Sequence, residues 1–145
     1  MSKTFPRRRM AQVWALQVDV AMDDGSFVDR RLAERTLCKG ALARYLGEVR
    51  SGAVPHVVDR DLDALSVPLV AGLGAYSLAA LTRDAVAQYA DDRVARLRRQ
   101  GRDADAARAA VAQELGLLRA MFETAIGRWK VGLTENPVPR TQISD

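Results

Sequence analysis

The chain has very little cysteine, and it has no long apolar run. Its single cysteine, Cys38, excludes an internal disulfide and favours a reducing compartment. No apolar stretch approaches the roughly 18 residues that a membrane-spanning helix needs. The start, MSKTFPRRRM, is basic but no apolar signal-peptide core follows it. We therefore expect a cytoplasmic protein with no membrane partner.

Residues that carry catalysis are equally scarce. The one histidine, His56, is predicted at the start of a helix, and acid–base catalysis needs a positioned partner for such a group. Cys38 is expected to be buried and structural. The aspartates of segment 59–63 alternate, which scatters them around a helix rather than forming one metal site. Gly72 and Gly74 lack the lysine of a phosphate-binding loop. The chain is interpreted as a binding module with no cofactor, metal or small-molecule substrate, and not as an enzyme.

What the sequence does contain is helical periodicity, with no alternating strand pattern and no repeat. Thr82 and Asp103 (or Asp105) are candidate N-caps, and Gly101 is expected to separate the last two helices by ending the first of them. Pro68 is expected to limit the third helix. The pattern predicts an all-α protein of five helices, over residues 7–22, 36–50 (with Thr36 as N-cap), 57–65, 83–99 and 103–130.

The last predicted helix carries an apolar seam that steps by three and four residues. Such a seam indicates packing against other helices. Its members are Val111, Leu115, Leu118, Phe122, Ala125 and Trp129.

The charge of the chain is basic and is supplied almost entirely by arginine. The net charge is +4, and of 22 basic residues only three are lysine. Arginine suits phosphate recognition, so a polyanion partner is one interpretation, and the codon usage of a GC-rich genome is the other. The candidate DNA-contacting residues lie on the last two helices and the turn between them: Arg96, Arg98, Arg99, Arg102, Arg108, Gln113 and Arg119. Solvated helix ends with compensated dipoles are the alternative reading of this cluster.

Several short motifs, in order, resemble the core-binding domain of tyrosine recombinases of the phage integrase family. The motifs are Leu81-Thr82, Tyr89 and Arg93, Glu114-Leu115, Leu117-Leu118, Met121-Phe122, Ala125 and Asn136-Pro137. Upstream, LCKGALARYLGEV resembles the first helix of that domain. The stretch before residue 25 is similar to the end of the family's arm-binding domain, through Ser2 to Phe5, Ala11 and Trp14.

The resemblance implies an organisation and a function. It implies an arm-binding remnant over 1–25, a linker over 26–35, a core-binding domain over 36–136 and an exit linker over 137–145 toward a missing catalytic domain. The expected fold is an orthogonal bundle of about four helices, similar to a SAM-like fold, preceded by one extra helix. The expected partners are double-stranded DNA and other recombinase protomers, which form tetramers in the full-length family. The chain would contribute DNA binding to integration and recombination without catalysing them.

The sequence also departs from the family pattern. A threonine and an arginine that tend to contact DNA in the family are Ala110 and Gln113 here. The catalytic arginines, lysine, histidines and tyrosine belong to a domain that the chain does not show, so we expect a fragment. The alternative function is a helical protein–protein interaction module, or a truncated regulatory relative of a recombinase.

Overall fold

The computed structural model describes residues 29–55 and 61–139. These residues form five α-helices and one short 3₁₀-helix, and no strand occurs among them, which confirms the all-α prediction. The predicted helix over 7–22, His56 and the last part of the predicted exit linker (residues 140–145) lie outside the described residues.

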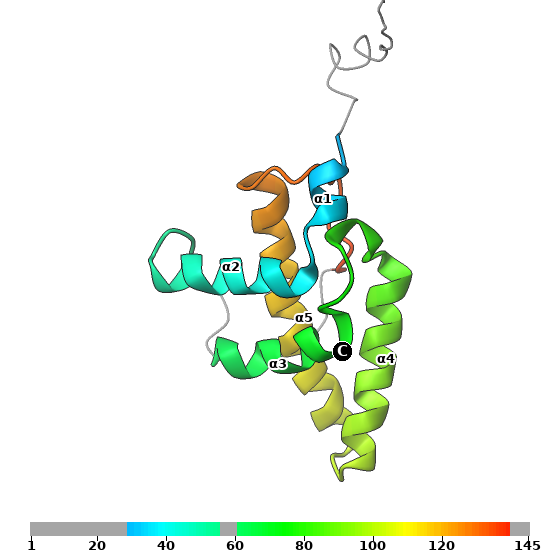
Figure 1. The fold of residues 1–145 in the computed structure, drawn as a ribbon. Helices are drawn as coiled ribbons and strands as arrows, with labels where there is room; N and C mark the ends of the chain where they lie inside the picture. The colour runs from blue at the N-terminus through cyan, green and yellow to red at the C-terminus, as the bar shows by residue number, and fades with distance from the viewer. Residues whose placement is uncertain (1–28, 56–60, 140–145) are drawn as a thin grey trace, which may run out of the picture.

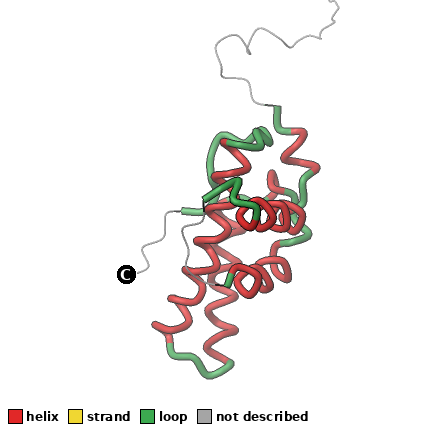
Figure 2. The backbone as a smooth tube through the Cα atoms, turned by 90° about the vertical axis from the view of Figure 1, so that its left-hand side faces the viewer, coloured by secondary structure: helices red, strands yellow, loops and turns green. Residues whose placement is uncertain are grey.

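Four of the helices build the body of the protein. Helices α4 (Arg83–Arg99) and α5 (Ala104–Gly127) form an antiparallel hairpin, and α2 (Cys38–Arg50) and α3 (Leu62–Leu73) lie across α5 (Figure 1). Figure 2 shows this crossing from the side, with two helices seen nearly end-on and the hairpin running lengthwise. The turn between α4 and α5 therefore extends beyond the rest of the bundle.

The boundaries of the hairpin follow from local chemistry, as predicted. The Thr82 hydroxyl accepts a hydrogen bond from the Ala85 N–H at 3.2 Å, and the Asp103 carboxylate accepts one from the Ala106 N–H at 2.7 Å. Each bond satisfies an N–H that the first helical turn leaves without a partner. Between the helices Gly101 has a φ of +104°, a conformation that favours glycine.

The predicted linker over 26–35 contains a helix, which corrects that prediction. Helix α1 (Arg31–Arg35) has a fully buried Ala33, whose N–H donates to the Val131 carbonyl at 2.9 Å. Thr36 was predicted to cap the next helix, but its hydroxyl donates back to the Leu32 carbonyl at 2.7 Å, and α2 starts two residues later. The segment is part of the bundle because Ala33 is buried there and its N–H bonds to Val131, which lies far along the chain.

Helix α3 also differs from the prediction, since it begins later than expected and continues through Pro68. A proline inside a helix costs about 3 kcal/mol. Leu69 and Leu73, which follow it, are buried against the core, and each such burial contributes about 1.5–3 kcal/mol. Burial therefore outweighs the local cost of the proline, and the helix continues to Leu73, with the turn starting at Gly74.

The apolar seam of α5 is confirmed as the centre of the core. All six of its predicted members are buried, together with Cys38, which was expected to be structural. The helix ends at Gly127, three residues earlier than predicted, yet Trp129 is still buried. Its indole N–H donates to Glu48 of α2 at 3.0 Å, and the guanidinium of Arg44 lies 4.3 Å from its ring centroid. This contact joins the end of α5 to α2.

Candidate nucleic-acid interface

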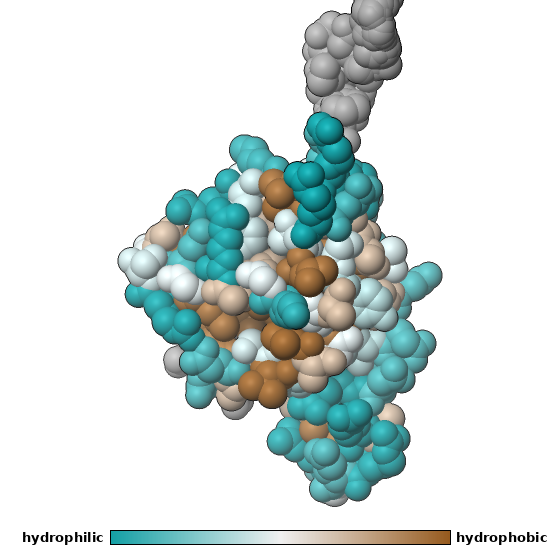
Figure 3. All heavy atoms as spheres, in the orientation of Figure 1, coloured by the Kyte–Doolittle hydropathy of each residue, from teal (hydrophilic) through white to brown (hydrophobic). Residues whose placement is uncertain are grey.

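The end of the α4–α5 hairpin concentrates exposed arginine side chains. Arg96, Arg98 and Arg99 lie in the last turn of α4, and Arg102 follows in the connecting turn. All four are exposed, and none forms an ion pair with another residue of the described ranges. On the face drawn in Figure 3, this end of the molecule is hydrophilic. The hairpin end is therefore a concentrated patch of positive charge.

These side chains are not needed to cap the helix. Backbone N–H groups of Gln100, Gly101 and Arg102 donate to the last carbonyls of α4 at 3.0–3.1 Å. The turn itself thus satisfies the orphan carbonyls of Arg96, Leu97 and Arg98. The guanidinium groups still interact favourably with the helix dipole, but all their hydrogen-bond donors remain available to a ligand.

The cluster continues from the turn onto α5. Arg98, Arg99 and Arg102 surround a shallow hollow at the turn. Arg102 also lines a second hollow of about 420 Å³, which reaches along α5 to the half-buried Gln113. Small side chains between them, Ala106, Ala109 and Ala110, keep this surface open. The structure therefore brings four of the predicted residues into one region: Arg98, Arg99, Arg102 and Gln113. Arg96 lies in the same last turn of α4 but lines neither hollow.

Arg108 is less clearly part of this region. It lies on α5 and forms an ion pair with Asp105 one turn earlier, and both side chains are exposed. Exposed pairs of this kind contribute about 0–1 kcal/mol, so the pairing does not prevent another contact. Arg108 lines neither hollow.

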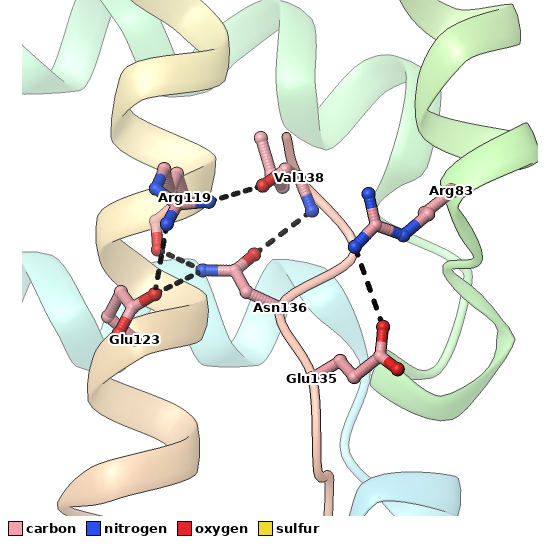
Figure 4. Close-up of polar contacts among 6 residues, drawn as sticks. All are labelled: Arg83, Arg119, Glu123, Glu135, Asn136 and Val138. Atoms are coloured by element: carbon pink, nitrogen blue, oxygen red, sulfur yellow. Dashed lines mark hydrogen bonds and ion pairs between the residues drawn. The ribbon is translucent and has the colours of Figure 1, made fainter. Parts of the chain in front are cut away.

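Arg119 has a different environment from the other predicted residues. It lies 17 positions beyond Arg102, roughly 25 Å along α5. Its guanidinium donates to the Val138 carbonyl and pairs with Glu123 at 3.5 Å (Figure 4). The Asn136 amide donates to the Arg119 carbonyl and to Glu123, each at 3.0 Å. The structure thus separates Arg119 from the hairpin end and gives it a structural role.

The same contacts change the interpretation of the exit segment. An exit linker was predicted to start at residue 137, but Pro137 and Val138 are buried. The Asn136 side chain also accepts from the Val138 N–H at 3.0 Å. Regular structure already ends with α5 at Gly127, nine residues before Asn136, yet the chain stays attached to α5 through Val138.

Three residues that carry the family resemblance form one buried network. Glu114 of α5 is nearly fully buried and accepts from the Tyr89 hydroxyl at 2.7 Å and from Arg93 at 3.1 and 3.2 Å. Burial, and secondly the bond to Glu114, raises the pKa of Tyr89. These residues join α4 to α5 and so fix the shape of the hairpin. Sequence reasoning missed this bond, although the four-residue spacing of Tyr89 and Arg93 places both on one helix face.

Comparison with known proteins adds no assignment: no family model matches the chain, and no curated protein or solved structure was found similar to it. Within the described ranges, no helix combines the length and apolar character needed to cross a membrane. The same ranges hold no group of three or more histidine, cysteine or acidic side chains placed to bind a metal ion.

Proposed function

We propose that this chain binds double-stranded DNA, as a segment comparable to the core-binding domain of a tyrosine recombinase. The single observation that carries the proposal is the cluster of four exposed arginines, unpaired within the described residues, at the end of the α4–α5 hairpin. Arginine neutralises phosphates and binds them through two parallel hydrogen bonds. Four such groups on a protruding end suit contact with a few phosphates of a duplex.

The residues of the cluster take different parts in this proposal. Arg98, Arg99 and Arg102 contact phosphates, and Arg96 lies at the edge of the same surface. Gln113 lies on the adjoining face of α5, where its amide can bind an adenine edge or a phosphate oxygen. Arg108 is a peripheral contact, and Arg119 is withdrawn from the interface because it holds Val138.

The all-α architecture and the Tyr89–Arg93–Glu114 network support the family comparison without establishing it. A SAM-like orthogonal bundle and an assembly with recombinase protomers stay predictions. The proposal assigns the chain no catalytic residue, cofactor or metal. Its contribution to DNA integration or recombination is to hold the duplex.

The proposal is tested by reversing charge at two places on the protein. A hairpin variant carries Arg98→Glu and Arg102→Glu, and a control variant carries Arg35→Glu and Lys39→Glu, which make the same change in net charge. All four residues are exposed. Fluorescence anisotropy with a labelled duplex should show binding in the micromolar range at moderate salt, typical of non-specific affinity. The hairpin variant should bind about tenfold or more weakly than the control.

Equal losses in the two variants would contradict the assignment, because they would show that net charge alone attracts the duplex. Absence of binding by the unmodified chain at low salt would contradict DNA binding itself. Circular dichroism of both variants shows whether the helical fold is retained.

A further inference from the structure

A groove lies between α3 and α4, on the side of the hairpin that carries Arg96. Its volume is about 780 Å³, and it is open to solvent along one side. Val67, Pro68 and Tyr76 form one wall, and α4 forms the other from Ala85 to Arg99. On the face drawn in Figure 3, apolar side chains gather over α3, above the hydrophilic hairpin end.

The α3 wall is apolar on a side that the bundle does not cover. Leu69 and Leu73 are buried, but of the residues that line the groove Val67 is 65% exposed, and Tyr76, just after the helix, is 46% exposed. Asp63, in the first turn, is the only charged residue of this helix. A helix that is apolar on both sides is normally covered on both, and contiguous exposed apolar surface marks an interaction site.

The α4 wall carries an exposed carboxylate, Asp92, near its middle and two arginines at its end. Near the middle of this wall Gln88 donates to Asp92 at 2.9 Å, and Arg93 is held by Glu114. Arg96 and Arg99 follow at the end of the helix, where neither forms an ion pair with a described residue. A ligand that fills the groove therefore meets apolar surface along the α3 wall, the Gln88–Asp92 pair near the middle of the α4 wall, and at one end two cations that have no ion-pair partner among the described residues.

We propose that this groove binds a segment of a partner protein that has apolar side chains along one face and carboxylates at one end. The wall from Ala85 to Arg99 rises about 21 Å, which matches a helix of about 14 residues. A DNA duplex is the less suitable occupant because its backbone offers no apolar surface to cover Val67 and Tyr76. The carboxylates at one end of the partner segment would form ion pairs with Arg96 and Arg99.

This site is distinct from the proposed DNA contacts of Arg98 and Arg102, and Arg99 borders both surfaces. A partner in the groove would therefore compete with DNA only at its charged end.

The test measures binding of designed peptides to the full chain by fluorescence anisotropy. Two labelled probes of about 14 residues place leucines at helical spacing, with glutamates at the N-terminal end in one and at the C-terminal end in the other, because the groove does not define a direction. One control peptide replaces the glutamates by lysines, and another replaces the leucines by glutamines. We expect saturable binding of at least one acidic probe and weaker binding of both controls.

Variants of the protein locate the binding. Val67→Asp should weaken the acidic probe about tenfold, because it places a charge on the apolar wall, and Arg96→Glu should weaken it about fivefold. Arg98→Glu is the matched control, since it changes the same helix by the same charge away from the groove, and it should change the affinity less than twofold.

Three results would overturn the proposal. The first is no saturable binding of either acidic probe up to about 1 mM. The second is equal binding of the glutamine control peptide, which would show attraction by charge alone. The third is an unchanged probe affinity in Val67→Asp together with a loss of duplex binding, which would make the groove part of the DNA surface. The first two results do not depend on whether Arg98 and Arg102 contact DNA.

Discussion

Gly132 occupies a position where the chain permits no side chain. Its φ is +97°, and a Cβ atom built there would lie 1.9 Å from the carbonyl oxygen of Asp29. The close approach brings the start of the described chain against the segment that follows α5. Both the backbone conformation and the contact therefore require glycine.

We predict that Gly132→Ala lowers the free energy of unfolding by about 3 kcal/mol or more, because Ala adds a strained φ and a clash with a backbone oxygen that cannot move independently. Urea unfolding followed by circular dichroism measures the change. Gly47→Ala is the control: it lies inside α2 with nothing within 4 Å, and it should raise the same free energy by about 0.5–1 kcal/mol. Similar stabilities for the two variants would contradict the close approach at Gly132.

Cys38 gives the protein a predictable sensitivity to alkaline pH. Burial raises the pKa of its thiol from 9.0 to about 12. Above pH 9 the unfolded chain loses this proton while the folded chain retains it, so the free energy of unfolding should fall as the pH rises from 9 to about 12. The slope from this one group is at most about 1.4 kcal/mol per pH unit.

Cys38→Ala should show a shallower decline over the same range, although its stability at neutral pH is lower. The remaining decline comes in part from Tyr89, whose pKa burial and Glu114 also raise. Unfolding curves at pH 8 and pH 11 measure the difference. An identical pH dependence in the two proteins would show that the thiol ionises equally in both states.

At the scale of elements, two side chains, Arg119 and Asn136, hold the last described segment to α5. Asn136 donates to the Arg119 carbonyl and to Glu123, and it accepts from the N–H of the fully buried Val138. Without this side chain, the Val138 N–H would remain buried without its partner. Such a loss costs about 1–3 kcal/mol.

We predict that Asn136→Ala lowers the free energy of unfolding by about 2 kcal/mol and speeds amide exchange at Val138. Glu135→Ala is the control on the neighbouring residue. Its ion pair with Arg83, at 3.5 Å between largely exposed groups, should contribute less than about 0.5 kcal/mol. If the Val138 amide exchanges as fast in Glu135→Ala as in Asn136→Ala, the proposed attachment through Asn136 is wrong.

The elements that the sequence predicts well are those fixed by neighbouring residues. Thr82 and Asp103 cap their helices by accepting hydrogen bonds from backbone N–H groups three residues later. Gly101 ends the helical conformation through its own positive φ. Helix α3 was misplaced because the cost of Pro68 is local, whereas the burial of Leu69 and Leu73 depends on the rest of the fold.

In the candidate site, too, features fixed by neighbouring residues can be predicted, and those that depend on tertiary packing cannot. The clustering of Arg96, Arg98, Arg99 and Arg102 is visible in the sequence because these residues flank one turn. The withdrawal of Arg119 could not be predicted, since its partner Val138 lies 19 positions away and reaches it only through tertiary packing.

At the scale of the whole molecule, charge and apolar surface are arranged around one hairpin. Arginines without an ion-pair partner among the described residues lie at its end, and an apolar wall that no other described element covers lies beside it. Packing of α2 and α3 across α5 leaves this end projecting from the bundle (Figure 1). The arrangement favours contact with an extended polyanion at the end and with a partner segment at the side.

The measurement that tests DNA binding most directly is the affinity for a duplex over a range of salt concentrations. The logarithm of the affinity should fall linearly with the logarithm of salt concentration, with a slope of about −0.9 for each phosphate contacted. Phosphate contacts by Arg98, Arg99 and Arg102 predict a slope of about −3. Replacing Arg99 and Arg102 by alanine should make the slope shallower by about 2 units while the helical content stays the same. An unchanged slope in that variant, or an affinity that does not respond to salt, would contradict the assignment of the hairpin end as the DNA-binding surface.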